Sequence, residues 1–484
     1  MTNQLIAKNK MSLMLTAFLT VVVFFCLPRS LAVGLMLLFI LAASTFYFLL
    51  KLGFKEKKIY VLFLLVLLFH LGTTLVMYYT DFQPFSGHAG DYSTYHKSAV
   101  KISEGFRQGE FSLKNISSKY QDLFLDHYYP AIIGAIYALT LPEMIIGLLF
   151  NVWLTAISVV LVCLIILDIG ESYYLEVIDR QRKNAFIVGL IAAFYPSYIF
   201  NSGLLLKDTL EVFFVILGML FLIKTIKKFS WYKFFILYAS LICATHFRFY
   251  VGYALIAAFL VCWFLLSGIS IKKRLVYGLI FVVLLGFIPQ ISYNQGYYGI
   301  NSFKTYLNFK TIKFYRQTAY IPAPVTTSGN ASVHIIPDVV VVGMDSSFIA
   351  SSTLLGHIKS FVYVLFGPFP WQIKNLRQGF ALIEVIPWYL LLFFIFDGMM
   401  VLYKNKVKEA GPLLVFSFML IAVIAVFEAN FGIILRIRIP AFIFLLCIGS
   451  FGLNRDNILY NYINKFYEKI LGYWRGWIYR FQHS

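Results

Sequence analysis

The stretch IIGLLFNVWLTAISVVLVCLIIL, residues 145–167, contains no charged side chain. A helix of this length and polarity can span a bilayer, whose hydrocarbon core takes ~20 apolar residues. The rest of the chain has the same character, since 60% of its 484 residues are hydrophobic and 13% are charged, against about 45–50% and 25% in soluble domains. The composition therefore excludes a soluble globular fold, a disordered chain and a secreted disulfide scaffold. It predicts an all-α polytopic membrane protein.

Similar apolar runs recur along the chain and predict about 12 transmembrane helices. They lie at 11–27, 31–50, 59–78, 145–167, 185–202, 209–223, 234–249, 251–268, 275–291, 380–402, 412–427 and 439–453. Lysine and arginine concentrate in the cytoplasmic loops of membrane proteins. With these spans, the basic clusters at 51–58, 180–183, 224–233, 272–274 and 404–408 fall on one side, and so does the basic C-terminal tail. Both termini are therefore predicted in the cytoplasm, and the protein is assigned to the plasma (inner) membrane.

Two shorter apolar stretches, 128–141 and 354–370, do not fit as spans. Counting either as a crossing would move a basic cluster to the outer side, against the usual bias. Both are predicted to be interfacial or re-entrant helices of the outer face, which is allowed where protein covers the backbone. The first apolar run follows Lys8 and Lys10 without a small-residue cleavage site. It is predicted to be a retained anchor rather than a signal peptide.

The spans divide the chain into four parts. These are an N-terminal membrane module (1–291) that contains the first large outer loop (79–144), an extracytoplasmic loop region (292–379), the C-terminal transmembrane helices (380–453), and a basic and aromatic tail (454–484). The tail is predicted to lie on the cytoplasmic membrane surface. No soluble catalytic domain is evident in either outer region, so any active site must be built from outer loops and adjacent helix ends.

The charge balance indicates a membrane rather than a nucleic acid as partner. The chain carries 41 Lys and Arg against 22 Asp and Glu, a net charge of +19. Such a surplus can indicate nucleic acid, but in a membrane protein it contacts anionic lipid headgroups. The five cysteines all lie in apolar runs and are predicted to be packing residues rather than disulfides or metal ligands.

The motif GDYSTYH, residues 90–96, opens a short amphipathic pattern in the first outer loop. Asp91 is either a functional carboxylate or a cap that accepts a hydrogen bond from the first turn of the helix. His88 and His96 flank it, and each alone is also explained as an ordinary exposed histidine.

A second polar break is Lys207-Asp208 in PSYIFNSGLLLKDTL, residues 196–210. Ionisable residues at membrane depth are costly and suggest function. The alternative is that Asp208 caps the next helix while Lys207 extends to the interface.

Several arginines are predicted on the outer side, outside the cytoplasmic clusters. They are Arg248, Arg316, Arg436 and Arg438. Guanidinium binds phosphate through two parallel hydrogen bonds, which suits a phosphate or pyrophosphate ligand. Contact with the phosphates of lipid headgroups is the competing explanation.

These segments resemble the C-type glycosyltransferase superfamily, polytopic enzymes that include protein mannosyltransferases and lipid A aminoarabinose transferases. The resemblance covers about 60–268 and, more weakly, 360–453. It is carried by GDYSTYH, YPAIIGAIYAL, NVWLTAISVVLVCLI, PSYIFNSGLLLKDTL and RIRIPAF. It implies a polyprenyl-phosphate or polyprenyl-pyrophosphate sugar donor, catalysis on the outer face, and functional acids that correspond by position to Asp91 and Asp208. The chain departs from the protein mannosyltransferases at Tyr92, where they have a second adjacent acid.

The sequence thus leads to the hypothesis of a glycosyltransferase that moves a sugar from a polyprenyl-linked donor to a lipid-linked glycan, a surface polysaccharide or a protein. Asp91 is the candidate base, and Asp208 would orient the acceptor or support that base. The remaining candidates are Arg436, Arg438, Arg248, Arg316 and Lys207 for the donor phosphate, and His88, His96 and Tyr95 for the acceptor. No metal and no cofactor is predicted, because the aspartates and histidines lack ligand spacing. A divalent cation beside Asp208 is the open alternative.

Two other functions remain open. A surface-polysaccharide polymerase or O-antigen ligase would use the same class of donor. A transporter or flippase for lipid-linked oligosaccharides would place cationic residues on both leaflets and would show repeated halves with broken helices. The sequence shows no such repeat, and its unusual polar residues are predicted on one side.

Overall fold

The computed structural model describes residues 27–52, 56–80, 91–120, 123, 128–171, 178–292, 295–312, 354–373, 379, 381–428 and 431–453. In these ranges every regular element is an α-helix or a short 3-10 helix, and none is a strand. The predicted all-α fold is thus confirmed for the described residues. Outside them lie the C-terminal tail 454–484 and, apart from Leu27, the first predicted span 11–27.

Seven helical segments of the described chain are long and apolar enough to cross a membrane. They are α2 (Arg29–Lys51), α3 (Lys57–Thr80), α7 (Met144–Glu171), α10 (Asp208–Lys227), α12 (Phe249–Leu266), α18 (Leu382–Lys404), and Lys408–Phe427, which joins a 3-10 turn to α19 (Gly411–Phe427). An eighth is formed if α8 (Ile178–Ala193) and α9 (Pro196–Ser202) are one bent span. The protein is therefore a multi-pass membrane protein. The total of twelve spans and their orientation stay predictions.

Shorter helices account for several other apolar runs. The helices α11 (Trp231–Phe247), α13 (Ile271–Leu285) and α21 (Ile439–Gly449) occupy three further predicted spans. The stretches predicted to be interfacial contain α6 (Tyr129–Leu139) and α16 (Leu354–Phe366), with 11 and 13 residues. At 1.5 Å per residue, each is much shorter than the ~30 Å hydrocarbon core.

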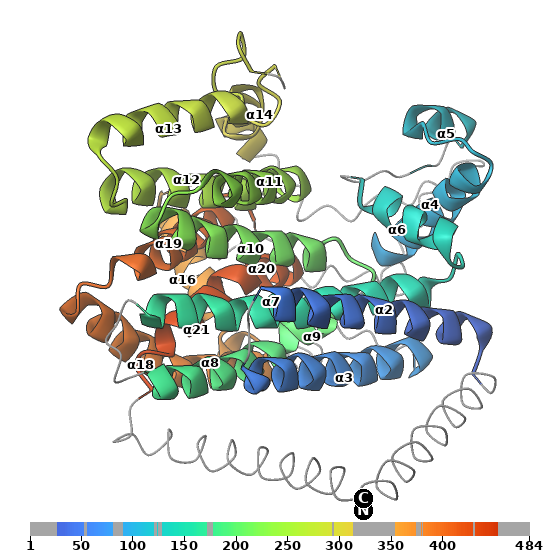
Figure 1. Cartoon of the computed structure of the whole chain (residues 1–484), viewed down its shortest axis with the longest axis horizontal. Helices are drawn as coiled ribbons and strands as arrows, with labels where there is room; N and C mark the ends of the chain where they lie inside the picture. The colour runs from blue at the N-terminus through green and yellow to red at the C-terminus, as the bar shows by residue number, and fades with distance from the viewer. Residues whose placement is uncertain are drawn as a thin grey trace, which may run out of the picture.

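The short helices between residues 91 and 139 gather at one end of the bundle. Figure 1 shows α4 (Asp91–Arg107), α5 (Leu113–Lys119) and α6 beside that end of the long helices. Helix α4 packs extensively on α6, which in turn packs on α7. This segment therefore forms a helical unit attached to the bundle through α6.

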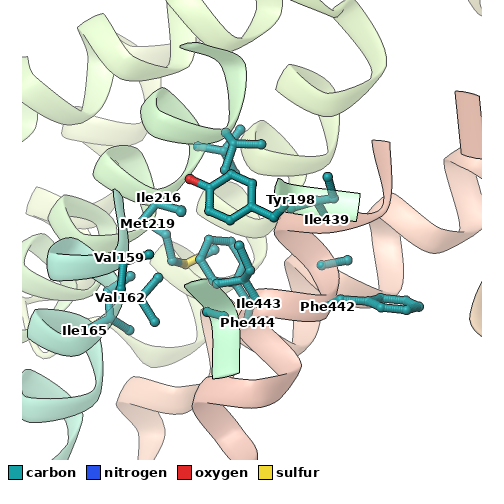
Figure 2. Close-up of a cluster of buried hydrophobic side chains, with 14 of the residues drawn as sticks. Val159, Val162, Ile165, Tyr198, Ile216, Met219, Ile439, Phe442, Ile443 and Phe444 are labelled. Carbon is teal, nitrogen blue, oxygen red and sulfur yellow. The ribbon is translucent and has the colours of Figure 1, made fainter. Parts of the chain in front are cut away.

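Helix α7 forms the centre of the bundle, where it packs against α2, α3, α8 and α10. Most of its buried side chains are apolar, and some of them surround Tyr198 of the short helix α9 (Figure 2). Figure 2 shows Tyr198 of α9 among side chains of α7, α10 and α21, namely Val159, Val162, Ile165, Ile216, Met219, Ile439, Phe442, Ile443 and Phe444. This packing holds the broken helix pair in the bundle.

A side chain from α3 contacts the polar groups at the break between α8 and α9. The two helices meet at an angle of 62°, and Pro196, which opens α9, cannot donate a backbone hydrogen bond. The buried His70 places Nε2 3.0 Å from the carbonyl oxygen of Ala193 and Nδ1 2.8 Å from Oγ of Ser202. A broken helix in a membrane is tolerated where such contacts satisfy the freed backbone groups.

Replacing His70 with leucine is expected to destabilise the protein by about 1–3 kcal/mol, because the Ala193 carbonyl loses its donor inside the core. His70→Gln keeps a donor and should lose less. Thermal unfolding of the detergent-purified protein measures both. A His70→Leu protein that unfolds at the wild-type temperature would show that the break does not depend on this histidine.

Candidate functional site

A cluster of charged side chains lies at the end of the bundle where α10 begins. We call it the carboxylate–arginine cluster, and its members are Asp208, Glu211, Arg248, Tyr250, Glu428 and Arg436. Asp208 and Glu211 are the first and fourth residues of α10, and this spacing puts both carboxylates on one helix face. Arg248 connects α11 to α12.

Arg248 is the centre of the cluster. Its Nη2 lies 2.5 Å from Oδ1 of Asp208, and its Nε lies 2.7 Å from Oε2 of Glu211. Its Nη1 donates to the hydroxyl of Tyr250 at 2.7 Å, and that hydroxyl donates to Oε1 of Glu428 at 3.2 Å. The three carboxylates are buried. Arg248 is thus engaged by protein groups, and we assign it to positioning the carboxylates rather than to binding a phosphate.

Arg436 is the more open of the two guanidinium groups. Its side chain is 28% exposed, and its Nη1 lies 4.0 Å from Oδ2 of Asp208. Its Nε donates to the carbonyl of Gly432 at 3.3 Å. Within the described ranges, neither Nη atom makes a hydrogen bond. Arg436 can therefore take an anionic ligand without breaking the cluster.

The cluster combines three acids with two arginines. Burial raises the pKa of the Glu428 carboxyl, although Arg248 and Tyr250 act in the opposite direction. Lys207, half-buried at the start of α10, adds a further positive charge beside Asp208. Two arginines and a lysine balance the three carboxylates, so an incoming phosphate meets a site without a large net charge.

Arg438 belongs to a different, fully buried network. Its Nη2 lies 2.8 Å from Oε1 of Glu384, and the two side chains are 1% and 2% exposed. Glu384 also accepts hydrogen bonds from the hydroxyls of Tyr195 (2.5 Å) and Ser197. Arg438 Nη1 donates to the carbonyls of Val364 (3.0 Å) and Gly367 (2.7 Å). These contacts leave no room for a phosphate, so Arg438 is not retained in the proposed site.

Asp91 is the first residue of α4 and is exposed. It has no hydrogen bond or ion pair with any other described residue. Tyr95 and His96, predicted as acceptor contacts, instead pack α4 on α6. Tyr95 is buried, with its ring edge-on to Tyr129 at 5.3 Å. His96 places Nδ1 3.1 Å from the hydroxyl of Tyr137, and burial lowers its pKa.

Tyr128 and Tyr129 connect the α4–α6 unit to the carboxylate–arginine cluster. The Tyr129 hydroxyl donates to Oδ1 of Asn151, and Nδ2 of Asn151 donates at 3.0 Å to the carbonyl of Leu204, in the turn before Asp208. Tyr128 stacks on His246, two residues before Arg248. Asp91 and Asp208 make no direct contact, and the link between the α4–α6 unit and the turn before α10 runs through Tyr129 and Asn151.

Some candidates cannot be placed. His88 and Arg316 lie outside the described residues. Among the residues that are described, no group of three His, Cys, Asp or Glu side chains could hold a metal ion.

Three members of the cluster were not among the predicted site residues. Glu211 was detectable, because it follows Asp208 by three positions and a helix brings such residues together. Glu428 stands out in the sequence as an acid near Arg436 and Arg438, but its pairing with Tyr250 was not visible, because it joins residues 178 positions apart.

A cavity of about 300 Å³ lies at the other end of the bundle. Its charged lining residues are Glu56, Asp168, Glu171, Arg182 and Lys224. Lys224 follows Asp208 by sixteen residues along α10, or ~24 Å at 1.5 Å per residue. The cavity is therefore separate from the carboxylate–arginine cluster.

Comparison of the chain with protein-family models, curated proteins and solved structures finds no match. The resemblance to C-type glycosyltransferases therefore stays a prediction.

Proposed function

We propose that this protein is a membrane glycosyltransferase that moves a sugar from a polyprenyl-phosphate or polyprenyl-pyrophosphate donor to an acceptor hydroxyl on the outer face of the membrane. The proposal is supported chiefly by the carboxylate–arginine cluster. Three carboxylates and two guanidinium groups lie at one end of an apolar bundle, where ionisable groups are costly and point to function.

The proposed step is a displacement at the anomeric carbon of the donor sugar. The acceptor oxygen forms a bond to this carbon while the bond to the phosphate oxygen breaks, and the phosphate leaves with the electron pair. Asp91, exposed on α4, takes the proton of the acceptor hydroxyl. Arg436 stabilises the charge on the departing phosphate. Arg248 holds Asp208 and Glu211 in place, and Asp208 in turn faces Arg436.

Deletion of the gene, followed by mass analysis of lipid-linked and surface glycans, tests the proposal. Loss of one sugar from an otherwise intact glycan is the expected result. Single repeat units would indicate a polymerase, and unattached full-length chains would indicate a ligase. An unchanged set of glycans would contradict all three activities.

Arg436→Ala is expected to lower kcat/KM for the donor roughly ten- to hundredfold, because hydrogen bonds to charged groups contribute about 1.5–3 kcal/mol. Isolated membranes supplied with lipid-linked donor provide the assay. Arg182→Ala is the matched control, because the side chain of Arg182 is 41% exposed and pairs with Glu56 at the opposite end of the bundle. Equal losses in both variants would remove Arg436 from the phosphate site.

A further inference from the structure

Tyr128 has a backbone conformation that tyrosine rarely adopts. Its φ of 60° and ψ of 10° lie in the left-handed region, where the side chain crowds the backbone and glycine is favoured. Such strain persists only where the surroundings hold it, and it concentrates at functional sites. Tyr128 is the N-terminal cap of α6, so the strained residue begins the helix through which the α4–α6 unit is attached to the bundle.

The left-handed backbone presents the Tyr128 ring flat against an imidazole. The rings of Tyr128 and His246 are stacked with centroids 5.3 Å apart and planes 8° apart. His246 is itself held by Tyr298, whose hydroxyl lies 3.3 Å from Nδ1. Tyr128 nevertheless remains 50% exposed. His246 lies against one face of the ring, so a ligand that stacks on Tyr128 would use the opposite face.

Through His246, the Tyr128 ring contacts the segment that carries Arg248 of the carboxylate–arginine cluster. His246, under the ring, precedes Arg248 by two residues. The next residue, Tyr129, is linked through Asn151 to the turn before Asp208. Tyr129 also contacts Tyr95, one helical turn after Asp91. Tyr128 thus lies between His246, which precedes Arg248, and Tyr129, which is linked to the turn before Asp208 and to α4.

We propose that Tyr128 is a binding platform for a pyranose ring, with the sugar stacked on the face of Tyr128 opposite His246. The C–H groups of one sugar face carry partial positive charge, which is attracted to the negative face of an aromatic ring. The stack on His246 fixes the plane of the platform, and the left-handed backbone sets its direction. This inference rests on the proposed function, since it names the part of that site that holds the sugar.

A structural role for Tyr128 makes a different prediction. If the ring only covered His246, then removing it would destabilise the protein and would leave sugar binding unchanged. Tyr128→Gly separates the two roles, because glycine relieves the backbone while deleting the ring. Lys406→Gly is the matched control, since Lys406 is also left-handed, with φ of 53°, and lies beyond the far end of α18.

Saturation-transfer difference NMR on the purified protein in nanodiscs tests the platform. The probes are methyl glycosides of glucose, galactose, mannose and N-acetylglucosamine, which carry neither phosphate nor an aromatic ring. We expect at least one of them to bind the wild-type protein, Tyr128→Phe and Lys406→Gly alike. Tyr128→Gly should bind it roughly three- to tenfold more weakly and should unfold at the wild-type temperature or above.

The proposal is overturned if no glycoside binds the wild-type protein, or if Tyr128→Gly binds as well as the wild type. The NMR experiment requires no sugar transfer, so its outcome is distinguishable from that of the proposed function. Binding that depends on Tyr128, together with normal glycans in the deletion strain, would keep the platform and remove the transferase. Loss of glycans in the deletion strain, together with sugar binding that does not depend on Tyr128, would support the transferase and exclude the platform.

Discussion

Replacing Asp91 with asparagine is expected to abolish sugar transfer while the protein still accumulates in the membrane. A positioned general base contributes roughly 10²–10⁴-fold to the rate, and asparagine cannot accept the proton. Asp91 is exposed and makes no ion pair with the other described residues, so its removal leaves no buried charge unpaired. The loss should therefore fall on kcat, with little change in the thermal unfolding temperature.

Glu104→Gln is the matched control for Asp91→Asn. Glu104 is another exposed acid of α4, and it accepts a hydrogen bond from Tyr120 at 3.1 Å. Glycan analysis of cells that carry either variant compares the two positions. Normal glycans in the Asp91→Asn strain would exclude Asp91 as the base, and equal losses in both strains would indicate a general effect on α4.

Arg438→Ala is expected to destabilise the protein by about 3–5 kcal/mol, the usual effect of breaking a buried ion pair. The substitution leaves Glu384 charged at 2% side-chain exposure. It also removes the donor that joins α21 to the carbonyls of Val364 and Gly367. We expect strongly reduced accumulation and a lower unfolding temperature, measured by fluorescence-detected size-exclusion chromatography after heating.

A second variant shows whether the loss comes from the unpaired charge. Arg438→Met combined with Glu384→Gln removes both charges, and the glutamine carbonyl can still accept from Tyr195 and Ser197. This double variant should recover much of the lost stability. Arg182→Ala, which breaks a surface pair with Glu56, should change stability by no more than about 1 kcal/mol. A double variant as unstable as Arg438→Ala would contradict this explanation.

Much of the fold could be predicted because a membrane-spanning helix is visible as an apolar run within its own short stretch of sequence. The uncharged run 145–167 lies within α7, and 380–402 nearly coincides with α18. The positions of the basic clusters indicate that the stretches 128–141 and 354–370 are not spans, and the helices in them are short. The apolar run 439–453, in contrast, was predicted as a full span but contains only an 11-residue helix. Apolar composition does not distinguish a crossing helix from a buried shorter one.

The candidate site could be predicted only in part, because side-chain partners depend on the packing of distant helices. Arg436 and Arg438 are two residues apart and received the same predicted role. Residues two apart point in different directions around a helix, and the structure leaves one 28% exposed and the other 1% exposed. Arg248 was noticed as an outer arginine, but its pairing with Asp208, 40 positions earlier, was not visible in the sequence.

The order of pairing in the cluster has a consequence for how the protein is made. Asp208 and Glu211 leave the ribosome 40 and 37 residues before Arg248, a delay of roughly 2–8 s at about 5–20 residues per second. During this interval α10 carries two acids with no guanidinium partner, which opposes its release into lipid. We therefore expect helix α10 to remain with the insertion machinery until α11 and the first residues of α12 have arrived.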